Sequence, residues 1–262
     1  MSLKYPVYIP SKGRFDSNLT AKHLLKGGVR FHVVVEPQEA DCYAKALGKE
    51  NVLVLPFANL GQGSIPARNW IKQHSISLGH KRHWQIDDNC DGFYRLLGNR
   101  RLRCKPAEAL SAVEIFTDRY SNIDVSGLNY KMFIGNPTQK HRDYRLNCHV
   151  YSCTLTNNET PFCWRGRYNE DTDYCLQVLA AGRCVVQVNA FLVAKQATMT
   201  MKGGNSDELY KNDGRLAMAR ELERRWPGLV EVKRRFGRPQ HVVKWGVFRQ
   251  QLIPIQEAAP NE

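Results

Sequence analysis

The chain has 262 residues, 42% of them hydrophobic, and its 38 Lys and Arg against 25 Asp and Glu give a formal net charge of +13. This composition excludes a disordered or fibrous chain and predicts one large globular domain with a buried core. The charge favours a polyanionic partner, such as nucleic acid, a nucleotide or an anionic membrane, over a surface charged for solubility alone.

Membrane insertion and disulfide bonding are not expected. No apolar run approaches the roughly 20 residues of a transmembrane helix, and the N-terminal segment has no signal-peptide core. The eight cysteines show no Cys-x-x-Cys spacing, which predicts reduced thiols in a cytoplasmic protein without a membrane partner. A zinc site made of Cys148, His149, Cys153 and Cys163 would match no common spacing.

The first half of the chain alternates between strands and helices. Continuous apolar stretches such as residues 31–35 predict strands covered on both faces, and Gly27-Gly28 predicts the end of a helix. This alternation predicts an α/β fold with a parallel sheet. The predicted strands are residues 5–10, 31–35, 52–55 and 84–86, and the predicted helices are residues 16–26, 39–47 and 65–78.

The second half is less regular. Residues 201–206 (Met-Lys-Gly-Gly-Asn-Ser) predict a glycine-rich loop, and residues 231–250 are basic and contain aromatic residues. We expect residues 1–210 to form the main domain and residues 211–262 to form a helical, basic C-terminal extension packed on it. The predicted helices are residues 106–120, 169–181 and 214–226, and the predicted strands are residues 124–128, 148–155 and 184–188.

An acidic segment, Asp87-Asp88-Asn89-Cys90-Asp91, follows the fourth predicted strand directly. Clustered carboxylates repel one another unless a cation offsets the cost, and the usual cation is Mg²⁺ or Mn²⁺ held together with substrate phosphates. Because ligands of parallel sheets bind at the carboxyl ends of strands, residues 11–14 and Glu36 should converge on this segment. The alternative is a polar turn, which Asp and Asn also favour.

Three segments together resemble a glycosyltransferase of the GT-A fold. Residues 63–69 (Gly-Ser-Ile-Pro-Ala-Arg-Asn) resemble the turn and helix before the metal motif, and Asp87-Asp88-Asn89 stands in the place of Asp-x-Asp. Residues 169–174 (Asn-Glu-Asp-Thr-Asp-Tyr), with residues 179–182, resemble the x-Glu-Asp motif and its helix. The resemblance covers roughly residues 5–210 and implies a Rossmann-like fold with a mostly parallel central sheet flanked by helices.

A narrower resemblance is to the phage glycosyltransferases associated with TET/JBP dioxygenases. It rests on residues 7–14 (Val-Tyr-Ile-Pro-Ser-Lys-Gly-Arg), on Asp87-Asp88-Asn89 and on the basic, aromatic C-terminal segment. It implies a metal-dependent transfer of sugar from a UDP-sugar to 5-hydroxymethylcytosine in duplex DNA. It also implies a TET-like dioxygenase upstream and, for a phage protein, the cytoplasm of the host cell. The alternatives are a protein, lipid or glycan acceptor, and a non-catalytic nucleic-acid-binding module.

The resemblance also implies roles for particular residues. Asp87 and Asp88, with Asn89, would bind Mn²⁺ or Mg²⁺, although Asn89 brings no charge where an aspartate would complete the motif. Asp171 would be the catalytic base beside Glu170, with Asp173 as its substitute; the simpler alternative is a helix N-terminus that favours acids. The donor nucleotide would contact Pro10, Ser11, Lys12, Arg14, Glu36, Arg68, Asp87, Lys202 and Gly203.

The sequence has three basic segments, residues 100–105, 140–145 and 233–238, and the last two contain an aromatic residue, Tyr144 and Phe236. Such segments suit contacts to a phosphate backbone together with stacking on an exposed base; the alternative for each is a solvated face. A base that is modified in a duplex must be reached in the groove or flipped out, and Tyr130, Trp164 and Tyr168 are candidates for its pocket. The predicted nucleic-acid contacts are Arg101, Arg103, Arg142, Trp164, Arg234 and Arg235.

Overall fold

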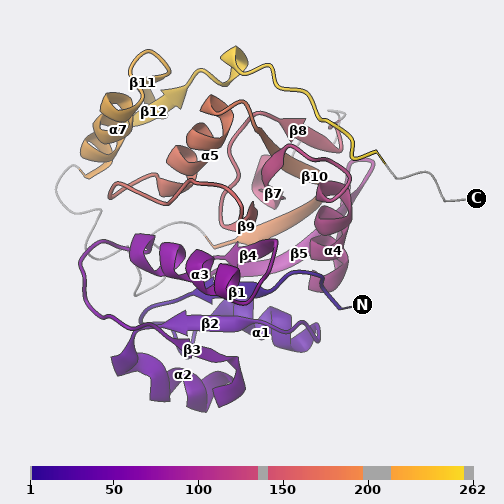
Figure 1. Ribbon diagram of the computed structural model, residues 1–262, viewed down its shortest axis with the longest axis vertical. Helices are drawn as coiled ribbons and strands as arrows, with labels where there is room; N and C mark the ends of the chain where they lie inside the picture. Colours follow the sequence, from indigo (N-terminus) through magenta and orange to yellow (C-terminus); the bar gives the residue numbers. More distant parts are fainter. Residues whose placement is uncertain (1, 135–140, 197–213, 257–262) are drawn as a thin grey trace, which may run out of the picture.

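A computed structural model describes residues 2–134, 141–196 and 214–256. One large sheet runs through the molecule, and helices cover both of its faces (Figure 1). Alternate residues of the N-terminal strands enter different clusters: Val33 and Val35 pack with α1, α2 and α4 on one face. Val34 packs with Ile71 of α3 on the other face. The continuous apolar strands are therefore covered on both sides, as predicted.

The first half confirms the predicted alternation, with element ends trimmed by a few residues. Strands β1, β2, β3 and β4 are parallel neighbours, so their carboxyl ends meet at one edge of the sheet. The elements are β1 (Val7–Pro10), α1 (Leu19–Lys26), β2 (His32–Val35), α2 (Ala40–Leu47), β3 (Val52–Val54), α3 (Ile65–Ser77) and β4 (Arg82–Ile86).

The second half adds strands that the sequence did not predict. Residues 100–104 are mostly charged and were interpreted as a surface segment, but they pair with the preceding strand as an exposed hairpin at the sheet edge. The elements are β5 (Cys90–Leu97), β6 (Arg100–Cys104), α4 (Pro106–Thr117), β7 (Ile123–Tyr130), β8 (Tyr144–Leu146), β9 (Cys153–Asn157), α5 (Glu170–Ala180) and β10 (Cys184–Lys195). Short 3-10 helices cover Pro37–Glu39, Lys49–Asn51, Lys131–Phe133 and Trp245–Val247.

The strand order is β3-β2-β1-β4-β9-β7-β10-β5-β6, with β8 paired to β10. Strands β1, β2, β3, β4, β6, β7 and β10 point one way, whereas β5, β8 and β9 point the other. The sheet is therefore mostly parallel, as predicted. None of the described helices is long and apolar enough to cross a membrane.

The C-terminal part of the described chain packs beside α5 (Figure 1). It consists of α7 (Gly214–Arg225) and a hairpin of β11 (Val230–Arg235) and β12 (Arg238–Val243). Leu222 and Val230 from this part bury against Leu176 of α5. This shared apolar cluster holds the hairpin next to the helix that carries Glu170 and Asp171.

Candidate active site

The acidic segment begins directly after β4 and is anchored through its backbone. The Asp87 carbonyl oxygen accepts a hydrogen bond from Thr20 Oγ1, and the Cys90 N–H donates to the same Thr20 Oγ1 at 2.9 Å. Thr20 lies in the first turn of α1. The helix therefore fixes the acidic segment at the edge of the sheet where ligands of parallel strands bind.

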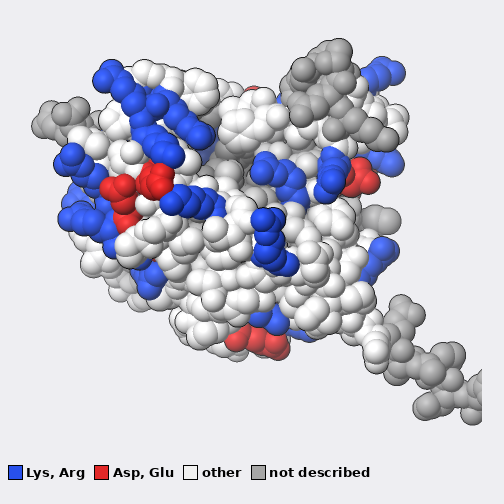
Figure 2. All heavy atoms as spheres, turned by 90° about the horizontal axis from the view of Figure 1, so that it is seen from above, with Lys and Arg blue, Asp and Glu red and all other residues white. Residues whose placement is uncertain are grey.

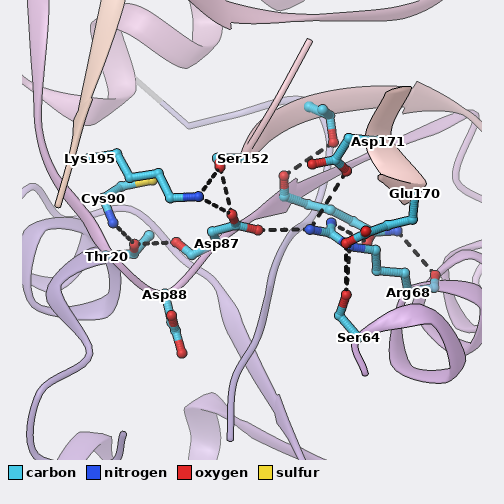
Figure 3. Close-up of polar contacts among 12 residues, drawn as sticks. Thr20, Ser64, Arg68, Asp87, Asp88, Cys90, Ser152, Glu170, Asp171 and Lys195 are labelled. Atoms are coloured by element: carbon cyan, nitrogen blue, oxygen red, sulfur yellow. Dashed lines mark hydrogen bonds and ion pairs between the residues drawn. The ribbon is translucent and has the colours of Figure 1, made fainter. Parts of the chain in front are cut away.

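The side chains of the two neighbouring acids, Asp87 and Asp88, point in different directions (Figure 3). Asp88 is 5% exposed. Its carboxylate accepts a hydrogen bond from Ser11 Oγ at 2.7 Å and forms an ion pair with Arg14. The carboxylate of Asp87 instead accepts hydrogen bonds from Arg68, Ser152 and Lys195. Successive side chains of an extended chain point to opposite faces, so the two acids do not face a common point.

Asp87 has three partners, each from a different element. Its Oδ1 lies 2.8 Å from Arg68 Nη2, and its Oδ2 lies 2.6 Å from Ser152 Oγ and 2.8 Å from Lys195 Nζ. Burial alone would raise the pKa of Asp87, but the charges of Lys195 and Arg68 outweigh it and hold this pKa well below its usual range. Asp87 is therefore ionised at neutral pH, and its side chain keeps 20% exposure, so a ligand can reach it.

Arg68 joins the acidic segment to α5. It projects from α3, is 3% exposed, and places Nη2 3.7 Å from Asp171 Oδ1 and Nε 3.7 Å from Glu170 Oε1. Ser64 Oγ also donates to Glu170 at 3.0 Å. Burial lowers the pKa of Arg68, but the surrounding carboxylates outweigh this and raise it. One buried guanidinium thus holds three carboxylates that are far apart in the sequence.

Asp171 lies in the first turn of α5, which follows Asn169 in the left-handed conformation with φ of 54°. Asn tolerates this conformation, and a helix N-terminus favours acids. Burial is nevertheless the largest influence and raises the pKa of Asp171 to about 7, with Glu170 adding to the rise and Arg68 opposing it. A carboxylate with this pKa can accept a proton at neutral pH, as a general base must.

Sequence reasoning missed Ser152 and Lys195. Ser152 has φ of 57°, a conformation that is unfavourable for a residue with a side chain and that recurs at functional sites. Lys195 is the last residue of β10, and the predicted strand ended at residue 188. The only sequence signal for Lys195 was its place after a long apolar stretch, which does not show what its ammonium group contacts.

The other predicted donor contacts form a second cluster after β1 and β2. Lys12 Nζ lies 3.0 Å from Glu36 Oε2, and Glu36 Oε1 accepts a hydrogen bond from the Asn59 N–H at 3.0 Å. Pro10 is the last residue of β1. Ser11, Lys12, Arg14 and Glu36 therefore converge at the edge that the sequence predicted. Lys202 and Gly203 lie outside the described residues.

Asp173 does not belong to this site, which corrects its prediction as a substitute base. It is fully buried. Its oxygens accept hydrogen bonds from Arg165 Nε at 2.9 Å, Gln177 Nε2 at 2.8 Å and Trp226 Nε1 at 2.8 Å. Residues two apart on a helix do not share a face. Asp173 therefore ties α5 to α7 while Asp171 faces Arg68.

Trp164 is a second correction. It is 3% exposed, and its ring stacks on Tyr174 at 4.3 Å between centroids. It therefore packs in the core and offers no face to a nucleic-acid base. Tyr168 is half-buried, whereas the ring of Tyr130 lies 5.8 Å from Lys195 Nζ. The remaining predicted nucleic-acid contacts are exposed: Arg101, Arg103, Arg142, Arg234 and Arg235.

The predicted metal ligands do not form a divalent-cation site in this arrangement. Asp88 is buried and paired with Arg14, and Asp87 is paired with Lys195 and Arg68. Asn89 Oδ1 is buried and accepts no hydrogen bond from the described residues. An amide oxygen can ligate a hard cation, but it is a single neutral oxygen and brings no charge. Among the described residues no group of three or more His, Cys, Asp and Glu is placed to bind a metal.

The fold is a mostly parallel sheet flanked by helices, with acidic side chains directly after β4 and in the first turn of α5. A family model described as TET-Associated Glycosyltransferase matches residues 5–204. The chain belongs to this family of glycosyltransferases. No curated protein matches the sequence.

Two solved structures resemble the fold. The crystal structure of GalNAc-T7 with UDP, GalNAc and Mn²⁺ has a TM-score of 0.46 and 14% identity, covering 74% of this chain and 44% of that chain. A protein named as a nucleotide-diphospho-sugar transferase, from Desulfovibrio desulfuricans G20, has a TM-score of 0.45 and 11% identity, covering 86% of this chain and 96% of that chain. This chain thus spans less than half of the length of the first of these structures.

Proposed function

We propose that the protein transfers a sugar from a UDP-sugar to the hydroxyl group of 5-hydroxymethylcytosine in duplex DNA, acting after a TET-like dioxygenase has produced that base. The observation that carries the reaction is the placement of Asp171, with its raised pKa, beside Arg68 and Asp87 at the carboxyl edge of the sheet. The family description, which names association with TET enzymes, supports the acceptor.

The transfer needs a base for the acceptor and a positive charge for the leaving group. In an inverting reaction the acceptor oxygen attacks the anomeric carbon while the bond from that carbon to the diphosphate breaks. The electron pair of this bond leaves with UDP, and the acceptor proton passes to Asp171. Glu170, held by Ser64 at 3.0 Å, positions the helix turn that carries this base. The residues after β1 and β2 bind the nucleotide.

The surface supports a DNA acceptor. Figure 2 views the molecule from the side of α7 and the β11–β12 hairpin and shows many more Lys and Arg than Asp and Glu on this face. At the tip of the hairpin Phe236 is 89% exposed, and the neighbouring cations are exposed. An aromatic ring among cations suits contact with a phosphate backbone and stacking on an unpaired base. The cations are Lys233, Arg234, Arg235 and Arg238.

The test uses duplex DNA that contains 5-hydroxymethylcytosine, incubated with the protein and a panel of UDP-sugars and then digested to nucleosides for mass spectrometry. We expect a hexose or N-acetylhexosamine adduct on the modified nucleoside, and none on matched DNA with unmodified cytosine. Release of UDP without an adduct would refute the DNA acceptor and favour a protein, lipid or glycan acceptor. If no donor is consumed, a non-catalytic nucleic-acid-binding module becomes the better interpretation.

The exposed arginines of the β11–β12 hairpin are expected to contribute to DNA affinity. The double variant Arg234→Ala/Arg235→Ala should bind duplex DNA more weakly, and the slope of log K against log salt should fall by about 2, because each lost phosphate contact removes about 0.9. Fluorescence anisotropy over a salt series measures both quantities. The control Lys45→Ala/Lys49→Ala removes the same charge from exposed positions beside α2. Equal slopes for the two double variants would refute the assignment of the hairpin.

A further inference from the structure

We infer that the ammonium group of Lys195 takes the place of the divalent cation and neutralises the diphosphate of the donor, so that donor binding needs no metal ion. This inference deepens the proposed function and rests on its assignment of the Asp87 edge to the donor diphosphate. It makes Lys195 a catalytic residue that the sequence motifs do not contain. It also differs from the divalent-metal site that the Asp87-Asp88-Asn89 segment predicts.

The position of Lys195 is that of a bound cation. Its Nζ lies 2.8 Å from Asp87 Oδ2 and 2.6 Å from Ser152 Oγ, and Ser152 Oγ lies 2.6 Å from the hydroxyl of Tyr130. The ammonium thus sits on the carboxylate that the motif assigns to the metal (Figure 3). A metal ion that approached Asp87 Oδ2 would meet a positive charge already in contact with that oxygen, and it would have to displace it.

The chain supports this ammonium from several elements. Lys195 ends β10, pairs with Cys90 at the start of β5, and follows a shift in the β10–β5 register. The next residue, Gln196, donates its backbone N–H to the Asn89 carbonyl at 3.2 Å and its side chain to Asp91 at 3.0 Å. The end of β10 is therefore tied to the acidic segment at Asn89 and Asp91. The ammonium is positioned before any ligand arrives.

Three carboxylates at this edge, those of Glu36, Asp87 and Asp88, are each paired with a cation of the chain. Asp88 is paired with Arg14, and Glu36 with Lys12. Asp87 has two cations, Lys195 and Arg68, and it shares Arg68 with the two acids of α5, whereas Lys195 pairs with Asp87. The Asp87 carboxylate, 2.8 Å from Lys195 Nζ, favours the charged form of the lysine. With 17% of its side chain exposed, Lys195 can contact a ligand without leaving Asp87.

A preformed ammonium suits the chemistry of the leaving group. Negative charge accumulates on the diphosphate as the bond to the anomeric carbon breaks, and a fixed cation that costs no reorganisation stabilises it. Lysine is a compact charge with three donors. Asp87 and Ser152 accept two of them. No other residue of the described ranges accepts a hydrogen bond from this ammonium, so the third donor can serve a phosphate oxygen. Ser152, whose backbone has the unfavourable φ of 57°, makes one of these contacts to Lys195.

The experiment measures UDP binding by isothermal titration calorimetry, once in EDTA and once with Mn²⁺. The variants are Lys195→Met, which removes the charge, and Lys195→Arg, which retains it. The control is Lys45→Met, an exposed lysine on α2. Mn²⁺ binding is measured separately by the loss of the free-ion signal in electron paramagnetic resonance. Circular dichroism confirms that each variant is folded, since Asp87 keeps Arg68 and Ser152 as partners in all of them.

The wild-type protein and Lys45→Met should bind UDP with the same Kd in EDTA and in Mn²⁺. Lys195→Met should lose roughly 10- to 100-fold in affinity in EDTA, the effect of one charge-assisted hydrogen bond, and should gain Mn²⁺ binding through the vacated Asp87. Lys195→Arg should lose much less.

Two results would overturn the inference in different ways. Wild-type binding of UDP that requires Mn²⁺, or unchanged binding by Lys195→Met in EDTA, would refute the role of Lys195 and leave the proposed donor intact. If wild-type protein binds UDP under neither condition, both the inference and the proposed donor are wrong. The two failures are therefore distinguishable from the same titrations.

Discussion

Replacing Asp171 with Asn lowers the rate of sugar transfer on the order of 10²–10⁴-fold, the usual contribution of a general base. Asn has the same shape but cannot accept the acceptor proton. In the wild-type enzyme the rate should rise with pH through about 7, because Asp171 must be ionised and its pKa lies there. The variant should lose this rise. A pH series of kcat/KM with a fixed UDP-sugar measures both effects.

The same substitution should raise the stability of the protein at pH 8, although it lowers the rate of sugar transfer. The pKa of Asp171 is higher in the folded than in the unfolded protein, so the stability associated with its protonation is present at low pH and lost as the pH rises through about 7. The asparagine side chain carries no charge, and we expect a higher Tm for Asp171→Asn than for the wild-type protein at pH 8. A variant that lost activity and stability together would indicate a structural role instead.

Asp173→Asn is the matched control on the same helix. Its carboxylate is buried among Arg165, Gln177 and Trp226, so the substitution should lower stability and leave the pH profile of the rate unchanged. A loss of the pH dependence in this control would contradict the assignment of the base to Asp171.

Replacing Arg68 with Met should destabilise the protein by roughly 3–5 kcal/mol, the cost of removing one partner from a buried ion pair. Arg68 is 3% exposed and lies within 4 Å of three carboxylates: Asp87, Glu170 and Asp171. Without it these acids repel one another, and their pKa values rise in the folded state. The loss of stability should therefore be larger at pH 8 than at pH 6. Urea unfolding at the two pH values measures it.

Arg82→Met is a suitable comparison for Arg68→Met. Arg82 is equally buried but lies near Asp118, 3.4 Å from its carboxylate, at the opposite ends of the strands. Arg82→Met should lower stability without weakening the binding of UDP, whereas Arg68→Met should lower stability and UDP affinity together. Equal UDP affinity in the two variants would show that Arg68 does not contribute to the donor site.

Local sequence patterns were sufficient for the framework of this protein. Apolar stretches covered on both faces, with glycines at helix ends, predicted the alternating strands and helices of the first half. Their parallel order then placed Ser11, Glu36 and Asp87 at one edge. The charged strand β6 was missed because it lies at the sheet edge, where pairing needs no apolar pattern. Helix α5 and its acidic first turn were also predictable from residues 169–181.

The sequence by itself therefore determined the fold class and the two acidic segments, because these depend on contacts between neighbouring residues and on strand order. Only the tertiary structure decided which acids face each other. Asp88 turns to Arg14, and Asp173 turns to Trp226, because adjacent positions on an extended chain or a helix point in different directions. Lys195 reaches Asp87 across 108 residues of chain, and the pairing of β10 with β5 sets that contact, which no local pattern encodes.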